Sequence, residues 1–277
     1  MFVVMANISV LILTLNEQDN LADCLASCSW CDDVVVFDSL SNDRTVKIAQ
    51  SLGARVEQRA FDNYAAQRSA ALQTVTYRHD WVLMLDADER VAEDLATEMQ
   101  QSVQQATPDI TMFRMRRKDF FFGRWLRRSS GYPTWFGRLV RPGQVRIERS
   151  INEEYLTEGR IAALQSHLEH HPFNKGIEWW YARHNRYSSL EAQATLQERT
   201  ESLQLANVLN SDPVVRRRAL KRLVYRLPMR PMVVFLYLYI VRLGLFDGLP
   251  GLYFCAMRAS YELMIDLKVA ELQRRPQ

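Results

Sequence analysis

The sequence has few of the features that would place the protein outside the cytoplasm or across a membrane. Four cysteines in 277 residues are too few for the disulfide framework of a small secreted protein. No secretory signal is recognisable, because the apolar residues 1–5 lead directly into a polar, strand-like segment. The nearest candidate for a membrane span, Met232 to Val241, is too short to cross a bilayer and is followed by Arg242. We therefore expect a cytoplasmic protein.

Glycine-rich phosphate loops are also missing, as are internal repeats and low-complexity segments. Without such a loop, a bound diphosphate would be neutralised by a metal ion and by arginines. The hydrophobic fraction of 48% and the charged fraction of 24% are ordinary for a globular protein. The length allows one large domain with an appendage, or two small domains.

The net charge is only +3, but the basic residues are concentrated in two clusters. Residues 114–149 contain eleven Arg or Lys and two acids, and residues 216–242 contain eight Arg or Lys and no acid. Aromatic residues accompany the first cluster, which favours a surface that binds sugars and phosphates, because rings stack on sugars and Arg pairs with phosphate. An ordinary basic surface is the alternative. The second cluster adjoins an apolar block, which is typical of an element lying in an anionic membrane interface. A packed helical pair or a dimer interface is the alternative, and nucleic-acid binding is disfavoured.

Strand-like and helix-like segments alternate in the first half of the chain. Apolar runs predict strands at 7–15, 33–37, 54–58 and 81–85, and helical spacing predicts helices at 20–30, 44–52, 63–74 and 92–105. This alternation predicts an α/β fold with a mostly parallel sheet and helices on both faces. Further strands are expected at 110–118 and 145–155. We expect a catalytic domain at 1–175 and a helical, membrane-associating region at 176–277.

Polar side chains follow three of the predicted strands. They are Thr14, Asn16 and Glu17 after the first, Asp38, Ser41 and Asp43 after the second, and Asp86 and Asp88 after the fourth. In a parallel sheet these strand ends lie at one edge, where ligands bind. Asp86 and Asp88 point to the same side of an extended backbone, and two converging carboxylates suit Mg²⁺ or Mn²⁺ completed by phosphates. A solvated acidic turn is the alternative.

Four segments in this part, TLNE, DSLSNDRT, AQRSAAL and WVLMLDADER, resemble the nucleotide-binding half of the family 2 glycosyltransferases. The later segments FFGRWL, HHPFNKGIEWWYARHNRYSSLEA and RLGLFDGLPGLYF are similar to family members that assemble lipopolysaccharide core and cell-surface polysaccharide. The resemblance implies a GT-A fold. It also implies inverting transfer of a sugar from a nucleotide diphosphate donor, a UDP sugar by preference, to a lipopolysaccharide core or lipid-linked glycan.

The resemblance further implies roles for individual residues. Asp38 would bind the uracil or another base, Thr14 and Glu17 would line the nucleotide pocket, Asp86 would lie by the ribose and the metal, and Asp88 would ligate Mg²⁺ or Mn²⁺. Gln67 and Arg68 match a donor-contacting Q-R-N motif whose Asn is replaced by Ser69 here. His171 is similar in position to a His that faces the diphosphate or metal, with a structural His cluster as the alternative.

The general base of the resembling enzymes falls in a His-Glu pair, which corresponds here to Asn152 and Glu153. We expect Glu153 to take the proton of the acceptor hydroxyl, with Glu154 as the fallback and a surface role for both as the alternative. In the first basic cluster, Arg124, Trp125 and Arg138 are the expected contacts to the acceptor or diphosphate.

Three other functions remain to be weighed. Transfer to polyprenyl phosphate would require a membrane pocket beside the diphosphate and no acceptor groove. A non-catalytic protein that binds nucleotide sugar is suggested by Asn152 and Ser69, which depart from the family pattern. Cys24, Cys28 and Cys31 have the spacing of an iron–sulfur site, but their helical phase favours buried, apolar cysteines.

Overall fold

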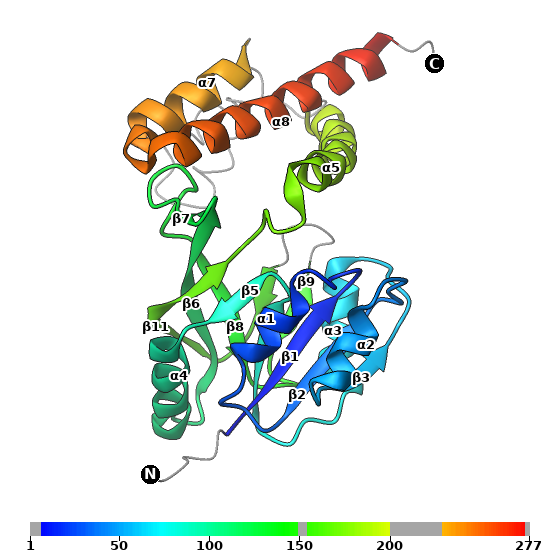
Figure 1. The fold of residues 1–277 in the computed structure, drawn as a ribbon, viewed down its shortest axis with the longest axis vertical. Coiled ribbons are helices and arrows are strands. Elements are labelled where there is room, and N and C mark those ends of the chain that lie inside the picture. The colour runs from blue at the N-terminus through cyan, green and yellow to red at the C-terminus, as the bar shows by residue number, and fades with distance from the viewer. Residues whose placement is uncertain (1–6, 149–153, 200–228, 275–277) are drawn as a thin grey trace. The chain divides into compact units, whose positions relative to one another are not determined.

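The computed structural model describes residues 7–148, 154–199 and 229–274, and the chain divides into two compact units. The sheet unit comprises the chain up to Phe120 together with Tyr132–Asn174, and the helical unit comprises Phe121–Gly131 and the chain from Lys175 onward. Figure 1 labels most of the helices and strands of both units. The segment Phe121–Gly131 lies within the expected catalytic domain by sequence, yet it belongs to the helical unit.

Four parallel strands form the first half of the sheet. β1 (Ile8–Thr14) lies between β2 (Val34–Asp38) and β4 (Trp81–Asp86), and β3 (Arg55–Gln58) lies beyond β2. The residues of β1, β2 and β4 are mostly apolar and buried, as expected for parallel strands that are covered on both faces, whereas β3 is polar and partly exposed. The register places Thr14 beside Asp38 and Leu13 beside Asp86, so the polar ends of β1, β2 and β4 lie together.

The second half of the sheet is mixed. Beyond β4 follow β8 (Trp135–Val140), β6 (Ile110–Phe121), β11 (Arg160–His170) and β5 (Glu89–Val91). β6 and β11 are parallel, whereas β8 is antiparallel to both neighbours and β5 is antiparallel to β11. β7 (Arg124–Trp125) pairs with β6, and β9 (Arg146–Glu148) forms a separate pair with β10 (Glu154–Leu156). The single strand expected at 145–155 is therefore wrong, and β11 was not expected.

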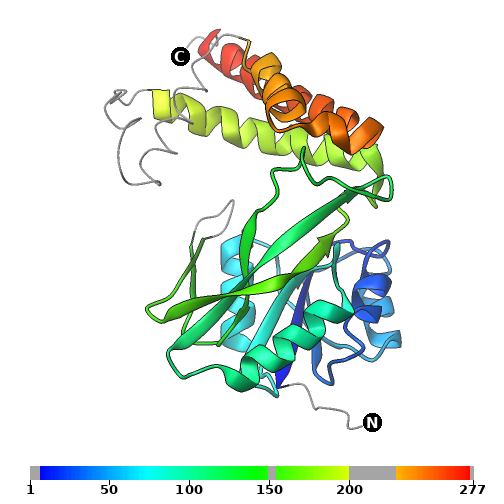
Figure 2. The ribbon, with the colours of Figure 1, turned by 90° about the vertical axis from the view of Figure 1, so that its left-hand side faces the viewer.

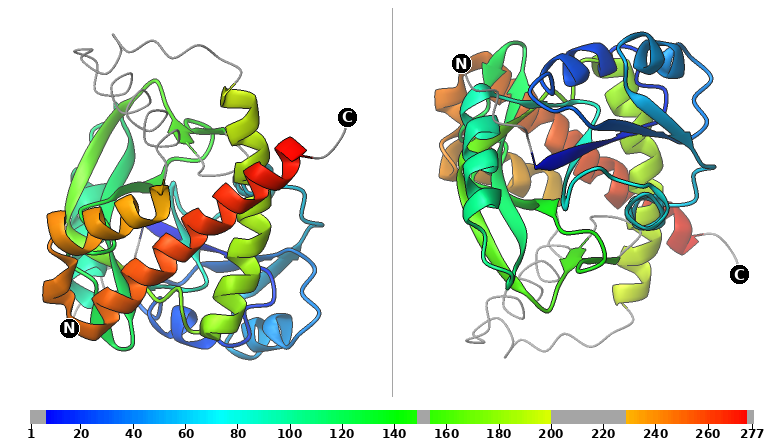
Figure 3. Two further views of the ribbon diagram at one scale, coloured as in Figure 1. Left: turned by 90° about the horizontal axis from the view of Figure 1, so that it is seen from above. Right: turned by 90° about the horizontal axis from the view of Figure 1, so that it is seen from below.

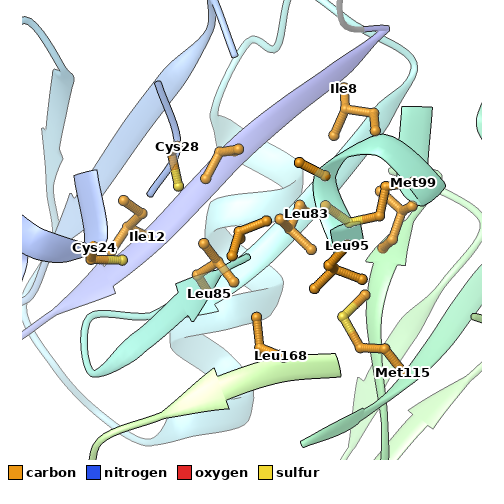
Figure 4. Packing of buried hydrophobic residues seen from close by; sticks show 14 of the residues in the cluster. Ile8, Ile12, Cys24, Cys28, Leu83, Leu85, Leu95, Met99, Met115 and Leu168 are labelled. Carbon is orange, nitrogen blue, oxygen red and sulfur yellow. The ribbon is translucent and has the colours of Figure 1, made fainter. Parts of the chain in front are cut away.

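Helices cover both faces of the sheet, as the sequence predicts. α1 (Leu21–Ala26), α2 (Thr45–Ser51) and α4 (Glu93–Gln105) contribute to one apolar cluster, and α3 (Tyr64–Thr74) contributes to the cluster on the other face. Figure 4 shows Leu83 and Leu85 of β4 packed near Leu95 and Met99 of α4. Cys24 and Cys28 lie in the same cluster and are buried, which agrees with apolar core cysteines.

The helical unit contains α5 (Gly176–Arg199), α7 (Arg230–Leu236), the π-helical turn η2 (Tyr237–Val241), the 3₁₀ turn η3 (Gly244–Asp247) and α8 (Gly248–Arg274). α8 packs on α5 and on α7, and Figures 2 and 3 show α5 and α8 crossing. Buried Arg230 forms ion pairs with Glu262 at 2.8 Å and Asp266 at 3.5 Å, so α7 folds back along α8.

A membrane-spanning helix is not found among the described residues, since no single one is long and apolar enough to cross a bilayer. The pair Arg230–Val241 and Gly244–Arg274, bent by 73°, meets the length and composition criteria only when its two members are taken together.

Candidate functional site

Hydrogen bonds join the loop after β1 to the loop after β2. The backbone N–H of Asn16 donates to Ser41 Oγ at 2.8 Å, and the Asn16 side chain accepts from the backbone of Asn42 at 2.9 Å. Asp43 accepts from the backbone of Gln18 at 3.2 Å. Glu17 donates from its backbone to Thr45 Oγ1 at 2.7 Å. The residues predicted at these two strand ends are thus brought together.

Asp38 is the centre of this network. Its carboxylate is fully buried and accepts hydrogen bonds from Thr14 Oγ1 at 2.9 Å, from the Ser41 backbone at 2.8 Å and from Gln58 Nε2 at 3.1 Å. The Ser41 hydroxyl donates to it as well. A carboxylate offers about four lone-pair directions, so a contact to a base would replace one of these bonds. In this state Asp38 and Thr14 shape the loop.

Gln67 and Arg68 lie on α3, and both are buried. Gln67 accepts from Arg59 Nη1 at 2.6 Å and donates to Ser39 Oγ at 3.0 Å, so it ties α3 to the loop after β2. Arg68 instead reaches the end of β4, where its Nη2 lies 2.5 Å from Asp86 Oδ1. Arg68 therefore neutralises the first carboxylate of the Asp86–Asp88 pair.

Asp86 has a second arginine partner. Arg138 of β8 donates from Nη2 to Asp86 Oδ2 and to Glu89 Oε1, both at 2.8 Å. Burial works against the ionised form of Asp86, but Arg68 and Arg138 hold the pKa of this carboxyl well below its usual range. The Arg138 side chain is buried between these two carboxylates, and its expected contact to acceptor or diphosphate stays a prediction. Asp86 is ionised and held in one orientation.

Glu89 was not among the predicted site residues, although it ends the acidic run after β4. It is fully buried, and its Oε2 accepts from the Asp86 backbone at 2.9 Å. Arg117 Nη1 lies 3.7 Å from its Oε1. Burial raises the pKa of Glu89 despite the opposing charge of Arg138. The sequence signal for Glu89 was an acid directly after the D-x-D motif. The sequence does not show that this acid is buried or which arginine pairs with it.

Asp88 faces His170, the residue before the predicted His171. His170 Nε2 lies 3.3 Å from Asp88 Oδ2, and its Nδ1 lies 2.7 Å from Asp119 Oδ1. Burial and Arg117 oppose protonation, yet the two carboxylates raise the pKa of His170 to about 9. The imidazole is therefore positively charged at neutral pH and bridges Asp88 and Asp119.

His171 takes a different position. Its ring stacks on Phe120 with centroids 5.0 Å apart, and its backbone N–H donates to the Asp88 carbonyl at 2.8 Å. Burial lowers the pKa of His171. Successive residues of a strand point to opposite faces, so a His-His pair at a strand end puts one ring toward the site and one away. The contact observed here is made by the His171 backbone, and the predicted contact of its ring to diphosphate or metal stays a prediction.

The donor groups at this sheet edge bear on the expected metal ion. No cluster of three or more His, Cys, Asp or Glu suited to a metal is present in the described part of the chain. Both Asp86 oxygens accept from arginines, and Asp88 Oδ2 lies 3.3 Å from His170 Nε2. Mg²⁺ is commonly held by one or two carboxylates while phosphates and water complete its shell. The residues therefore fit an ion that arrives with a diphosphate.

For four other predicted residues, the described part of the structure shows no contact that bears on their expected roles. Glu153 lies outside the described residues, and Glu154 begins β10 opposite Glu148. Arg124 and Trp125 form β7 in the helical unit, where Arg124 Nη2 donates to the Phe246 carbonyl at 3.0 Å. Their proposed contacts to acceptor, diphosphate or transferred proton remain predictions.

Comparison with known proteins identifies similar sequences and structures. An uncharacterized glycosyltransferase of Rickettsia bellii (strain RML369-C) is 39% identical over 94 residues, which are 34% of this chain and 31% of that protein. The lipopolysaccharide core biosynthesis glycosyltransferase LpsC of Rhizobium meliloti (strain 1021) is 27% identical over 192 residues, 67% of this chain and 70% of that protein. The chain spans about a third of the Rickettsia relatives that it matches.

Among solved structures, glucosyl-3-phosphoglycerate synthase from Mycobacterium tuberculosis, in complex with Mn²⁺, uridine diphosphate and glucosyl-3-phosphoglycerate, is 21% identical with a TM-score of 0.35. The match covers 41% of this chain and 44% of that chain. The model of the family described as "Glycosyl transferase family 2" matches residues 9–166, which is more than half of the chain and includes β2, β4, all but the first residue of β1, and both Asp86 and Asp88. The chain therefore belongs to family 2 of the glycosyltransferases.

Proposed function

We propose that the protein is a metal-dependent, inverting glycosyltransferase. In this proposal it moves a sugar from a nucleotide diphosphate donor, a UDP sugar by preference, to a lipopolysaccharide core or another lipid-linked glycan. It acts in the cytoplasm, in peripheral contact with the inner face of the cytoplasmic membrane. Family membership and the likeness to LpsC support the reaction class and the acceptor class.

The observation that carries the proposal is the convergence of three strand ends at one sheet edge. Thr14 lies in register with Asp38, and Leu13 lies in register with Asp86. A ligand at this edge meets polar loop groups that suit a nucleoside and a carboxylate pair that suits a metal-bound diphosphate. The apolar pattern of β1, β2 and β4 fixes this geometry, since each strand is buried up to its last residues.

The charges around Asp86 and Asp88 suit a diphosphate leaving group. A divalent ion, when bound, would stabilise the negative charge that builds on the departing diphosphate. Asp88 is the carboxylate that would hold the ion, and His170 and Asp119 fix its orientation. Asp86 is oriented by Arg68 and Arg138 and stays ionised at neutral pH. Groups held in place before the reaction avoid reorganisation as charge develops.

Inverting transfer also requires a base for the acceptor hydroxyl. We assign this role to Glu153, with Glu154 as the fallback, on the resemblance alone. Replacing Glu153 by Gln removes the proton acceptor while keeping size and polarity, so it separates loss of chemistry from loss of binding.

The testing experiment measures transfer and hydrolysis on a panel of nucleotide sugars, with and without Mn²⁺, in the presence of a membrane extract as acceptor. Wild type is compared with Asp88→Asn, Glu153→Gln and the matched control Asp109→Asn, an exposed carboxylate paired with Arg160. Nucleotide binding is measured in parallel by calorimetry.

Metal-dependent turnover that falls at least about a hundredfold in Asp88→Asn and Glu153→Gln, but not in Asp109→Asn, is the expected result. Nucleotide binding without turnover on any donor would overturn the enzymatic proposal and favour a binding protein. Transfer to polyprenyl phosphate alone would keep the donor site and overturn the glycan acceptor. Absence of nucleotide binding would overturn the whole assignment.

A further inference from the structure

One end of the helical unit exposes large apolar side chains. They come from the β6–β7 connection and from η2, η3 and the start of α8. We define this apolar tip as Phe122, Val241, Leu245, Phe246, Leu249 and Tyr253, all of which are exposed. Phe122 is 66% exposed and Phe246 is 64% exposed, although aromatic residues usually bury most of their surface. Contiguous exposed apolar surface of this kind marks a site of interaction.

The apolar tip is one surface built from two distant segments. Asp247 Oδ2 accepts from the backbone of Arg128 at 2.9 Å and from the backbone and hydroxyl of Ser129, both at 2.8 Å. Arg124 donates to the Phe246 carbonyl, and the rings of Phe122 and Tyr253 meet edge to face at 6.4 Å. β7 and the turn that follows it are thus held against η3, and Phe122, which lies shortly before β7, is presented on the same end of the helical unit as Phe246.

Close backbone packing supports the same arrangement. A Cβ added to Gly251 would lie 2.5 Å from the Gly244 carbonyl oxygen, so α8 and η3 approach as nearly as glycine allows. Arg230, at the start of α7, is tied to Glu262 in the middle of α8. Because α7 folds back along α8, η2 and η3, which connect them, lie together at one end of the helical unit.

The charges beside the apolar tip are positive. Residues 121–131 and 229–253 contain five arginines and one acid, Asp247. Asp247 is buried and already accepts three hydrogen bonds, so it does not offset the cations at the surface. Arg124, Arg127 and Arg128 are exposed and form a cationic rim next to Phe122. A second copy of this surface would bring arginines against arginines, whereas an anionic bilayer complements them.

We propose that the apolar tip inserts into an anionic lipid bilayer from one face, with Phe122 and Phe246 among the acyl chains and Arg124, Arg127 and Arg128 among the headgroups. Apolar groups at an interface are buried by roughly 5–10 Å, which a short helical turn supplies without crossing the membrane. The inference rests on the proposed function only in that a lipid-linked acceptor gives the protein a reason to reach the membrane. It adds the segment Phe121–Gly131, which lies outside the region that the sequence associates with the membrane.

The test is flotation of the full-length protein with phosphatidylglycerol vesicles and with phosphatidylcholine vesicles. The variants are Phe122→Asp and Phe246→Asp, and the matched control is Leu52→Asp, a 55% exposed leucine in the sheet unit. The basic residues between Arg216 and Arg226 also favour binding to anionic vesicles. Vesicle binding by the wild type therefore does not show that the apolar tip inserts, whereas the variants do. Circular dichroism confirms that each variant is folded.

We expect each Phe→Asp variant to lower the partition coefficient on phosphatidylglycerol by at least about tenfold, and Leu52→Asp to leave it unchanged. Replacing Arg127 and Arg128 by Gln lowers it by roughly fivefold for each charge on phosphatidylglycerol and has no effect on phosphatidylcholine. Equal binding of wild type and both Phe→Asp variants would overturn the proposal. A dimer in sedimentation that Phe122→Asp dissociates, without vesicle binding, would assign the surface to a second copy instead.

A fluorescent label distinguishes insertion from electrostatic contact. Phe122→Cys and Leu52→Cys are labelled with an environment-sensitive dye while the native cysteines are buried or half-buried. A blue shift on phosphatidylglycerol at position 122 alone supports insertion, and no shift at position 122 overturns it. Donor hydrolysis without vesicles is measured for the same proteins. Failure of the proposed function would abolish hydrolysis in all of them and leave these vesicle results unaffected.

Discussion

Arg138 is the residue whose removal tests the charge network around Asp86 most directly. Its side chain is buried and donates to Asp86 and to Glu89, both at 2.8 Å. In Arg138→Met a side chain of similar length fills the space without the charge. Glu89, which is 0% exposed, then keeps Arg117 at 3.7 Å and the Asp86 backbone N–H at 2.9 Å as partners.

The cost can be bounded from these contacts. Removing one partner of a buried ion pair costs about 3–5 kcal/mol, because a buried charge is left without compensation. Asp86 retains Arg68 and Glu89 retains Arg117, so we expect the lower end, about 3 kcal/mol. For a unit of this size, that loss lowers the melting temperature by roughly 6–12 °C.

A double-mutant cycle gives the assay its specificity. Arg138→Met with Glu89→Gln removes both charges, so we expect the double variant to recover at least about 1.5 kcal/mol relative to Arg138→Met. Unfolding in urea at neutral pH measures each free energy. Arg160→Met is the control, since Arg160 and Asp109 are 58% and 59% exposed and such pairs contribute at most about 1 kcal/mol. Strictly additive losses, or a cost for Arg138→Met below that of the control, would refute the reasoning.

Two further predictions concern cysteine reactivity and backbone packing. Burial raises the pKa of Cys31 to about 12 and that of Cys255 to about 11, so at pH 8 we expect both to react with iodoacetamide roughly a hundredfold or more below a free thiol. Mass spectrometry of native and denatured protein measures this, and fast native labelling would contradict it. Gly251→Ala places a Cβ 2.5 Å from the Gly244 carbonyl oxygen, which should destabilise the helical unit by about 1–3 kcal/mol. Hydrogen exchange in α8 reports the loss, and wild-type protection would contradict the packing argument.

The sequence predicts the parallel half of the sheet well because its strands are continuous apolar runs. β1 and β4 are buried on both faces, so neither their existence nor their ends depend on knowing the partner strand. β11 carries polar and charged residues at many positions and is only partly buried, which hides it from a search for apolar runs. β8 is short and begins with an exposed Trp135.

The candidate site likewise has residues that apolar runs locate and residues whose partners depend on long-range strand order. Asp38, Asp86 and Asp88 could be placed at strand ends, since that follows from where the apolar runs stop. Arg138 and His170 could not be assigned their partners. Which charges meet across the sheet depends on the order β4–β8–β6–β11, a long-range property that local pattern does not contain. The choice of His170 over His171 depends on the strand phase of β11.

The place of β8 in the sheet has a consequence for how the chain folds as it is synthesised. β8 pairs with β4 through Val82–Val140 and Leu83–Leu139, although more than forty residues separate the two strands. Until β8 is synthesised, β4 is an edge strand that pairs only with β1, and Glu89 lacks its ion-pair partner Arg138. The first hundred residues contain nearly all of the recognisable motifs, yet within them β4 has a neighbouring strand on one side only. A fragment ending after α4 would expose an apolar edge prone to aggregation, so we expect the first hundred residues not to fold as an independent module.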